Sequence, residues 1–165
     1  MKKIALFPGT FDPITLGHAD LISRGLNIFD EIIIGVSTAD GKTPLLNIDT
    51  RVDLINKIYS DNPRVSVKKI NGLLIDFIQN NNINSVIRGL RNPIDAAYEH
   101  EMLCMNRALY SDYEAIFLFP GDDVRYISSS RVREILSLGG DASLFVLPEV
   151  NYCIKEVIKH GFKNN

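Results

Sequence analysis

Two hydrophobic patterns alternate along the chain. Apolar runs of four to six residues are separated by longer stretches in which apolar residues return with the period of a helix. This alternation predicts parallel strands covered by helices on both faces. The expected strands lie at residues 3–8, 31–37, 64–70, 85–88 and 115–119. The expected helices lie at residues 17–29, 49–59, 73–80, 94–110, 129–138 and 149–159.

The order of these elements predicts an α/β protein with a doubly wound, five-stranded parallel sheet. No internal repeat, low-complexity tract or linker interrupts the sequence, so we expect residues 1–165 to form a single domain. Open α/β sheets bind ligands beyond the carboxyl ends of their strands. We therefore expect the chemistry in the segments that follow the first, second, fourth and fifth strands.

Composition narrows the class of protein. Hydrophobic residues make up 45% and charged residues 23%, which excludes disordered, collagen-like and disulfide-framework chains. The net charge of -2 provides no global basic field for nucleic acid, although a small anion in a local basic cleft stays possible. Cys104 and Cys153 lack C-x-x-C spacing, and the apolar run after Met1 is too short for a signal peptide or a membrane span. We expect a reduced, cytoplasmic protein that binds no membrane.

The segment after the first strand, residues 8–18, places His18 at the start of a helix. There His18 lies beside free backbone N–H groups and the positive end of the helix dipole, where phosphate binds. Gly17 lets a ligand approach the backbone, and the Thr10 hydroxyl is expected in the same cleft. A helix cap or a solvated side chain is the alternative for His18, and we interpret Asp12 as a loop-bracing residue.

Cations follow two further strands. Lys42 stands between a glycine and a threonine, but a P-loop needs a glycine at position 36, where the chain has Val36. We interpret Lys42 as a phosphate-neutralising cation, with a solvated lysine as the alternative. Arg88 and Arg91 come directly after a buried strand, where guanidinium groups need an anion or an acidic side chain. Glu99 is the candidate acid, so a structural ion pair is the alternative to an anion site.

Three serines begin the helix after the fifth strand, at residues 128–130. They supply hydroxyl and N–H groups at a second positive helix end, and one of them is expected to be the N-cap. The predicted cleft thus combines two helix starts, one histidine and several cations, without a nucleophile beside an activating base. Such a cleft suits phosphoryl or nucleotidyl transfer, in which catalysis is mainly positioning and charge stabilisation.

The sequence lacks the residue spacing of common metal-binding and hydrolase motifs. His100 and Glu101 are followed by Cys104, where H-E-x-x-H needs its second histidine, and no G-x-S-x-G occurs. We therefore predict no metal site built from protein side chains. Met102, Cys104 and Met105 are interpreted as core and packing residues of one helix.

Several motifs together carry a family resemblance. T-x-G-H at residues 15–18 and I-S-S-S-x-x-R at residues 127–133 resemble the nucleotidyltransferase superfamily related to class I aminoacyl-tRNA synthetases. Further motifs are similar to bacterial phosphopantetheine adenylyltransferases over nearly the whole chain. These are P-G-T-F-D-P-I-T-x-G-H from residue 8, K-x-P from 42, I-R-G-L-R from 87, Y-E from 98, M-N-R from 105 and G-G-D from 139.

The resemblance implies a Rossmann-like fold and transfer of AMP from ATP to 4′-phosphopantetheine, giving dephospho-coenzyme A and pyrophosphate in the penultimate step of coenzyme A synthesis. It implies that His18 is catalytic and that Thr10, Lys42, Leu74 and Arg88 bind the acceptor. It also implies Mg²⁺ held mainly through the ATP phosphates, a homohexamer, and feedback inhibition by coenzyme A. The implied ATP contacts are Thr10, Phe11, His18, Gly89, Leu90, Arg91, Glu99, Val124, Arg125, Tyr126, Ile127, Ser128, Ser129 and Ser130.

The chain departs from the family pattern in four places: Leu46, residues 47–50, Ala96 with Ala97, and residues 121–123. We expect these departures to affect affinity and inhibitor response more than the reaction. One alternative is an adenylyltransferase for another phosphorylated acceptor such as nicotinamide mononucleotide, against which the Arg-Gly-Leu-Arg sequence argues. Another is a non-catalytic nucleotide-binding regulatory module, which the intact His18 and Lys42 disfavour.

Overall fold

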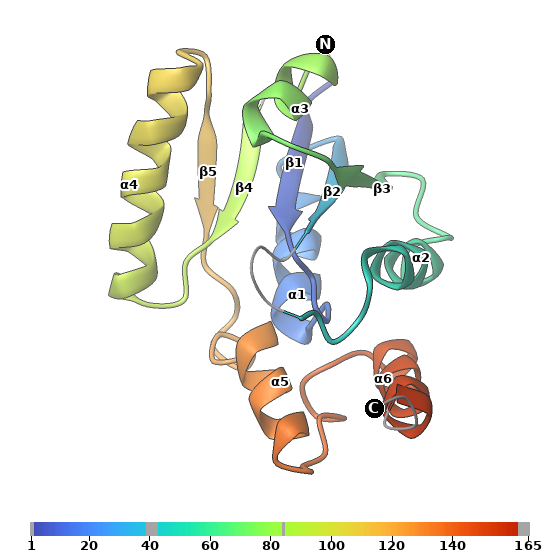
Figure 1. The fold of residues 1–165 in the computed structure, drawn as a ribbon. Coiled ribbons are helices and arrows are strands. Elements are labelled where there is room, and N and C mark those ends of the chain that lie inside the picture. Colours follow the sequence, from blue (N-terminus) through green and yellow to red (C-terminus); the bar gives the residue numbers. More distant parts are fainter. Residues whose placement is uncertain (1, 39–42, 84, 162–165) are drawn as a thin grey trace.

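The computed structural model describes residues 2–38, 43–83 and 85–161. In this part of the chain, five parallel strands form one sheet in the order β3-β2-β1-β4-β5 (Figure 1). Strands β2 and β3 are added on one side of β1, and strands β4 and β5 are added on its other side. The order in which the chain adds strands therefore reverses between β1 and β4. α/β sheets bind ligands at such a point. The strands are β1 (Ile4–Gly9), β2 (Glu31–Ser37), β3 (Val65–Ile70), β4 (Ser85–Gly89) and β5 (Ala115–Leu118).

Two hydrophobic clusters lie on opposite faces of the sheet. The larger one joins β1 and β2 to α1, α2, α5 and α6, and the smaller one packs α3 and α4 against the opposite face. In Figure 1, α5 and α6 lie beyond the carboxyl ends of the strands, next to the start of α1. The helices are α1 (Leu16–Gly25), α2 (Ile48–Ile58), α3 (Leu74–Asn80), α4 (Pro93–Leu109), α5 (Ser129–Ser137) and α6 (Pro148–Gly161).

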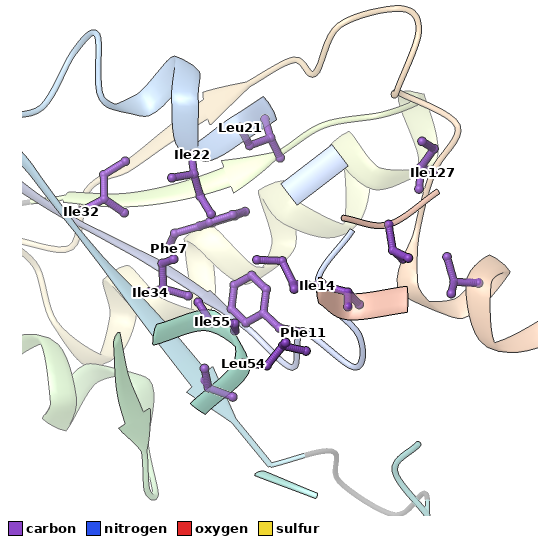
Figure 2. Close-up of a cluster of buried hydrophobic side chains, with 14 of the residues drawn as sticks. Phe7, Phe11, Ile14, Leu21, Ile22, Ile32, Ile34, Leu54, Ile55 and Ile127 are labelled. Atoms are coloured by element: carbon purple, nitrogen blue, oxygen red, sulfur yellow. The ribbon is translucent and has the colours of Figure 1, made fainter. Parts of the chain in front are cut away.

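The alternating direction of strand side chains assigns neighbours in β1 to different clusters. Ala5 and Phe7 belong to the larger cluster and Leu6 to the smaller one, and all three are buried. Figure 2 shows the larger cluster, in which Phe11 continues β1 past its end and lies near Ile14. Burial of each such side chain contributes roughly 1.5–3 kcal/mol, so the loop after β1 is part of the core.

Pro8 opens the sheet between β1 and β4. β1 pairs with β2 along its whole length, but it pairs with β4 only at Ala5 and Leu6. The Pro8 carbonyl faces β4, where it accepts from Arg88 at 3.5 Å, and a strand residue points its N–H and C=O groups to the same side. Because proline has no N–H, β1 has no donor for β4 at this position, and the two strands separate toward their carboxyl ends.

The expected fold class is confirmed, because every predicted strand and helix is present among the described residues. Most boundaries agree within one or two residues. The first helix ends at Gly25 instead of residue 29, and residues 26–28 form a turn after it. In the described part of the chain, no helix is both long enough and apolar enough to cross a membrane.

The interpretation of α4 was wrong in one respect. Cys104 and Met105 are exposed instead of being packed in the core, because α4 lies beside β4 and β5 at one end of the sheet and turns much of its surface outward (Figure 1). Met102 is half-buried. The exposed apolar residues of α4 recur every four to seven positions and form a stripe, which we call the α4 stripe: Ile94, Tyr98, Met105 and Leu109.

Candidate active site

A cavity of about 140 Å³ lies where β1 and β4 separate. Its wall combines both strands, the start of α1, the start of α4 and the segment after β5. Residues from three of the four predicted chemical segments, those after β1, β4 and β5, therefore meet at one place. The lining residues are Phe7, Pro8, Thr15, Gly17, His18, Leu21, Arg88, Gly89, Arg91, Glu99, Pro120 and Ile127.

His18 is held in this cavity by a helix cap. Thr15 is the N-cap of α1, and its backbone N–H donates to His18 Nδ1 at 3.1 Å. The Thr15 hydroxyl lies 2.9 Å from the same nitrogen and also accepts from the His18 N–H. This reciprocal pair is a capping box in which histidine replaces the usual Glu or Gln. The cap predicted as an alternative for His18 and its place in the cleft are therefore both present.

The protonation state of His18 follows from these contacts. Burial, and then the positive charge of Arg91, lower the pKa of the imidazole to about 4, so the ring is neutral near pH 7 in the ligand-free protein. Nδ1 accepts the Thr15 N–H, so the ring proton lies on Nε2. His18 therefore has a fixed hydrogen-bond donor on the ring edge away from its cap.

The segment after β5 closes onto the start of α1 at Gly17. A Cβ atom at this position would lie 3.2 Å from the Ile127 carbonyl oxygen and 3.3 Å from the Val124 carbonyl oxygen. These contacts are tight and involve backbone, so only glycine fits without a shift of the segment. The unusual residues 121–123 are anchored here as well, because Asp20 of α1 accepts the Gly121 N–H at 2.9 Å.

Half-buried Arg88 forms an ion pair with buried Glu99. Its Nε and Nη2 atoms donate to the two carboxylate oxygens at 2.7 and 2.6 Å. Burial opposes the charge on Arg88, but hydrogen bonds and the charge of Glu99 outweigh it, so the pKa of the guanidinium is raised. The structural ion pair that was the alternative to an anion site is thus present for Arg88. Nη1 makes only a long contact, of 3.5 Å, with the Pro8 carbonyl, and Arg88 lines the cavity.

Arg91 pairs with a different acid from the one expected. Its Nε donates to Asp95 at 2.9 Å, one turn into α4, and Glu99 is occupied by Arg88. The Arg91 side chain is partly exposed and lines the cavity beside His18. It is therefore the more accessible of the two cations for a phosphate.

A second, smaller cavity of about 60 Å³ adjoins the first across the Arg88–Glu99 pair. Leu74, at the start of α3, contributes to its wall. Most of the wall is apolar or aromatic, so the cavity suits an organic chain instead of a phosphate. The remaining lining residues are Tyr98, Met102, Leu103, Asn106, Tyr113, Ala115 and Phe117.

Thr10 and Phe11, the first two residues after β1, lie outside the described cavity lining. The Phe11 side chain is buried, and its ring packs edge-on at 5.0 Å from the His18 ring, so its expected contact with ATP is limited to its backbone. Phe11 has φ of 48°, a left-handed conformation that costs on the order of 1–3 kcal/mol for such a residue. Thr10 is half-buried and lies outside the described lining, and Leu90 is buried.

Other predicted residues have structural partners. Ser128 is the N-cap of α5, Ser129 donates to the Pro13 carbonyl at 2.8 Å, and Ser130 accepts from Arg133 at 3.3 Å. Exposed Arg125 pairs with Asp122 at 3.5 Å, and the Tyr126 ring packs against Phe145. Of residues 124–130, only Ile127 is in the described lining. Lys42 lies outside the described residues.

Two supporting residues were missed by sequence reasoning. Arg51 is buried and donates to three backbone carbonyls, and Arg133 donates to the Asp12 carbonyl at 2.6 Å. Asp12 does brace the loop as predicted, since its carboxylate accepts the N–H groups of Leu45 and Leu46. The sequence gives no signal for the partners of Arg51, because they are main-chain atoms of distant segments.

Comparisons with known proteins identify the family. The Cytidylyltransferase-like family model matches residues 6–135. A phosphopantetheine adenylyltransferase from Cupriavidus necator is 45% identical over 94% of this chain and 96% of its own length. The protein belongs to the phosphopantetheine adenylyltransferase family. Another phosphopantetheine adenylyltransferase, from Cupriavidus metallidurans, is 44% identical over the same shares of both chains. This family member is therefore a nucleotidyltransferase.

Solved structures share the fold of this phosphopantetheine adenylyltransferase family member. A bifunctional NMN adenylyltransferase/ADP ribose pyrophosphatase from Francisella tularensis, complexed with AMP and a Mn ion, superposes with a TM-score of 0.72 over 99% of this chain and 52% of that one. A Vibrio parahaemolyticus structure named for nicotinate-nucleotide adenylyltransferase gives 0.68 over 100% and 98%. Identities of 13% and 18% limit these likenesses to the fold.

Most departures from the family pattern lie outside the described cavity wall, but Gly121 directly follows Pro120, which lines it. Leu46 is buried in the larger cluster, and Asn47 caps α2 by accepting the Thr50 N–H at 2.8 Å. Ala96 and Ala97 lie in α4. None of these four residues belongs to the described lining of the 140 Å³ cavity.

Proposed function

We propose that this protein transfers AMP from ATP to 4′-phosphopantetheine, releasing pyrophosphate and forming dephospho-coenzyme A. The observation that carries the proposal is the position of Arg88, between a polar cavity beside His18 and an apolar cavity beside Leu74. An acceptor with a phosphate at one end and a long organic arm matches this pair of cavities. The names of the relatives at 44–45% identity point to the same acceptor.

In the proposed reaction, an oxygen of the acceptor phosphate attacks the α-phosphorus of ATP in line. The new P–O bond forms as the bond from the α-phosphorus to the bridging oxygen breaks, and pyrophosphate leaves. The cavity supplies donors and cations and presents no activated nucleophile in its described lining, so direct attack is favoured over an adenylyl-enzyme. His18 Nε2–H donates to phosphate oxygens as negative charge develops.

On the acceptor side, we assign the phosphate to Arg88 and Lys42 and the organic arm to the cavity beside Leu74. The pairing of Arg88 with Glu99 holds the guanidinium plane in place and leaves Nη1 for the phosphate. Thr10 is assigned to the reacting phosphates from the end of β1.

On the nucleotide side, we assign the ATP phosphates to the N-terminus of α1 and to Arg91. We assign the nucleoside to Gly89 and the segment 124–130, and the presence of Gly89 and Ile127 in the cavity lining supports this assignment. Phe11 and Leu90 contribute backbone atoms only, since both side chains are buried.

We propose that Mg²⁺ accompanies ATP. In the described residues, no three His, Cys, Asp or Glu side chains gather to hold a metal, and Glu99 in the cavity wall already binds Arg88. The residues therefore fit an ion held by phosphate oxygens and water, the ligands that Mg²⁺ favours. Such an ion offsets the negative charge of ATP as the acceptor phosphate approaches.

Three further proposals concern the whole protein. We propose a homohexamer, and the α4 stripe supports association between chains, because an exposed apolar surface of this kind is typical of an interface. Coenzyme A carries the same pantetheine arm as the acceptor, so it is expected to compete for the cavity beside Leu74 and inhibit the enzyme. Free Cys104 and Cys153 are consistent with the reducing cytoplasm.

The test is to incubate the protein with ATP, Mg²⁺ and a panel of phosphorylated acceptors that includes 4′-phosphopantetheine, nicotinamide mononucleotide and nicotinate mononucleotide. Mass spectrometry should detect dephospho-coenzyme A as the dominant product. Preferred adenylylation of a mononucleotide would replace the proposed acceptor, and nucleotide binding without pyrophosphate release would indicate a regulatory module.

A further inference from the structure

Arg51 is a charged residue in an unfavourable place. Its side chain is 2% exposed, and it lies in the first turns of α2, where the helix dipole opposes a positive charge. A buried guanidinium needs acceptors for its N–H groups. Nε donates to the Leu46 carbonyl at 3.0 Å, and Nη1 donates to the carbonyls of Thr10 and Ser37, the latter at 2.9 Å.

The two carbonyls bound by Nη1 come from adjacent strands. The β1–β2 ladder ends at the pair Gly9 and Val36, and Thr10 and Ser37 are the next residues of the two strands. Nη1 therefore bridges the strands one position beyond the last paired residues. Arg51 fixes the carboxyl edge of the sheet where it meets the cavity.

Arg51 is also linked, through Leu46, to the hydrogen bonds that Asp12 makes. Leu46 accepts from Arg51 through its carbonyl and donates its N–H to Asp12 at 2.8 Å. Thr10 and Asp12 are thus both tied to the segment before α2, with Phe11 between them. Phe11 is the residue with positive φ, and its ring packs on His18. A left-handed aromatic residue persists only where its neighbours hold it.

We infer that Arg51 is a positioning residue for adenylyl transfer, which holds Thr10 in place and, through Phe11, sets the orientation of His18. Neither Arg51 nor its partners Leu46 and Ser37 line the cavity, so Arg51 acts through other residues. This inference rests on the proposed function, and one of its readouts is independent of turnover.

The decisive variant is Arg51→Lys, which keeps the charge but replaces the forked donor by one nitrogen. We expect kcat to fall roughly 10- to 100-fold, because small misplacements of reacting groups cost this much. Folding is checked at the assay temperature by circular dichroism. The ¹⁵N signals of the His18 ring, assigned with His18→Gln, are expected to move. Arg64→Lys is the matched control, since Arg64 also donates to a carbonyl, that of Leu26, and should change neither readout.

Coupling to His18 separates positioning from packing. If Arg51 acts through His18, Arg51→Lys in a His18→Ala background should lower kcat less than threefold further. Unchanged kcat and unchanged His18 signals, or a full multiplicative loss in the double variant, would overturn the inference. If Arg51→Lys does not fold, Arg51→Gln takes its place, and failure of both to fold also overturns it. Absence of transfer by the wild-type protein contradicts the proposed function instead, and the ring signals still report on Arg51.

Discussion

His18 belongs both to a helix cap and to the cavity wall, so its two roles call for separate measurements. Its Nε2–H is expected to stabilise charge that develops in the transition state. His18→Ala should therefore lower kcat by roughly 10²–10³-fold while the Kd for ATP changes far less. Loss of the cap contact should cost about 1 kcal/mol of stability. A variant with lower Tm and wild-type kcat would leave His18 as a cap residue alone.

The lowered pKa of His18 predicts a pH-dependent stability. As pH falls below about 6.5, the unfolded chain takes up a proton on this ring that the folded protein refuses until about pH 4. The free energy of unfolding should thus fall between pH 6.5 and 4, by on the order of 3 kcal/mol from this group. His18→Gln keeps an acceptor for the Thr15 N–H and cannot titrate. Urea unfolding across this range should show a smaller slope for the variant, and equal slopes would contradict the assigned neutral ring.

Arg88 has a structural partner as well as a proposed substrate. Arg88→Met should lower kcat/KM for the acceptor roughly 100-fold, and it should also cost about 1–3 kcal/mol because buried Glu99 loses its donors. The double variant Arg88→Met, Glu99→Gln removes that buried charge. It should regain Tm without regaining acceptor use, as measured by thermal unfolding and steady-state kinetics. Recovery of both would show that Arg88 serves the fold only.

At the scale of elements, the contact between α1 and the segment after β5 is set by Gly17. Gly17→Ala places a methyl group against the carbonyls of Val124 and Ile127, so the segment must shift by a few tenths of an ångström. We expect the KM for ATP to rise roughly tenfold, since small displacements of binding groups are costly. Stability should change by less than about 1 kcal/mol, because alanine favours the helix.

Ser23→Ala is the control for this variant, because it changes helix propensity on the exposed side of α1. It should leave the KM for ATP at the wild-type value. If Gly17→Ala also retains the wild-type KM, the close approach of the two elements does not shape the nucleotide site.

Elements were easier to predict from the sequence than contacts. Runs such as residues 31–37 specify a buried strand by their composition alone, and β2 has those bounds. The location of the site followed from a general rule about sheets, and the opening at Pro8 agrees with it. Hydrophobic periodicity carries no information about distances between segments. Such distances determine the pairing of Arg91 with Asp95, the neutral state of His18 and the three acceptors of Arg51. The exposure of Cys104 was missed because an apolar position on a helix does not reveal what covers it.

At the scale of the whole molecule, the α4 stripe should decide assembly. The proposed hexamer contains six chains of 18.5 kDa each, and light scattering after size exclusion measures its mass. Met105→Glu places a charge in the stripe at a residue outside both cavities, so it should give smaller species. Gln79→Glu, at an exposed position of α3, adds the same charge elsewhere and should leave the mass unchanged. A monomeric wild-type protein, or an intact assembly in Met105→Glu, would remove α4 from the interface.

The missing N–H of Pro8 also bears on how the enzyme meets its substrates. The proline nitrogen carries no hydrogen in any conformation of the chain. The lack of a donor from β1 to β4 at this position therefore follows from the covalent structure of Pro8. A substrate that enters the cavity therefore has no hydrogen bond between β1 and β4 to break at Pro8. Binding energy that would otherwise separate two strands is left for bringing two anions together.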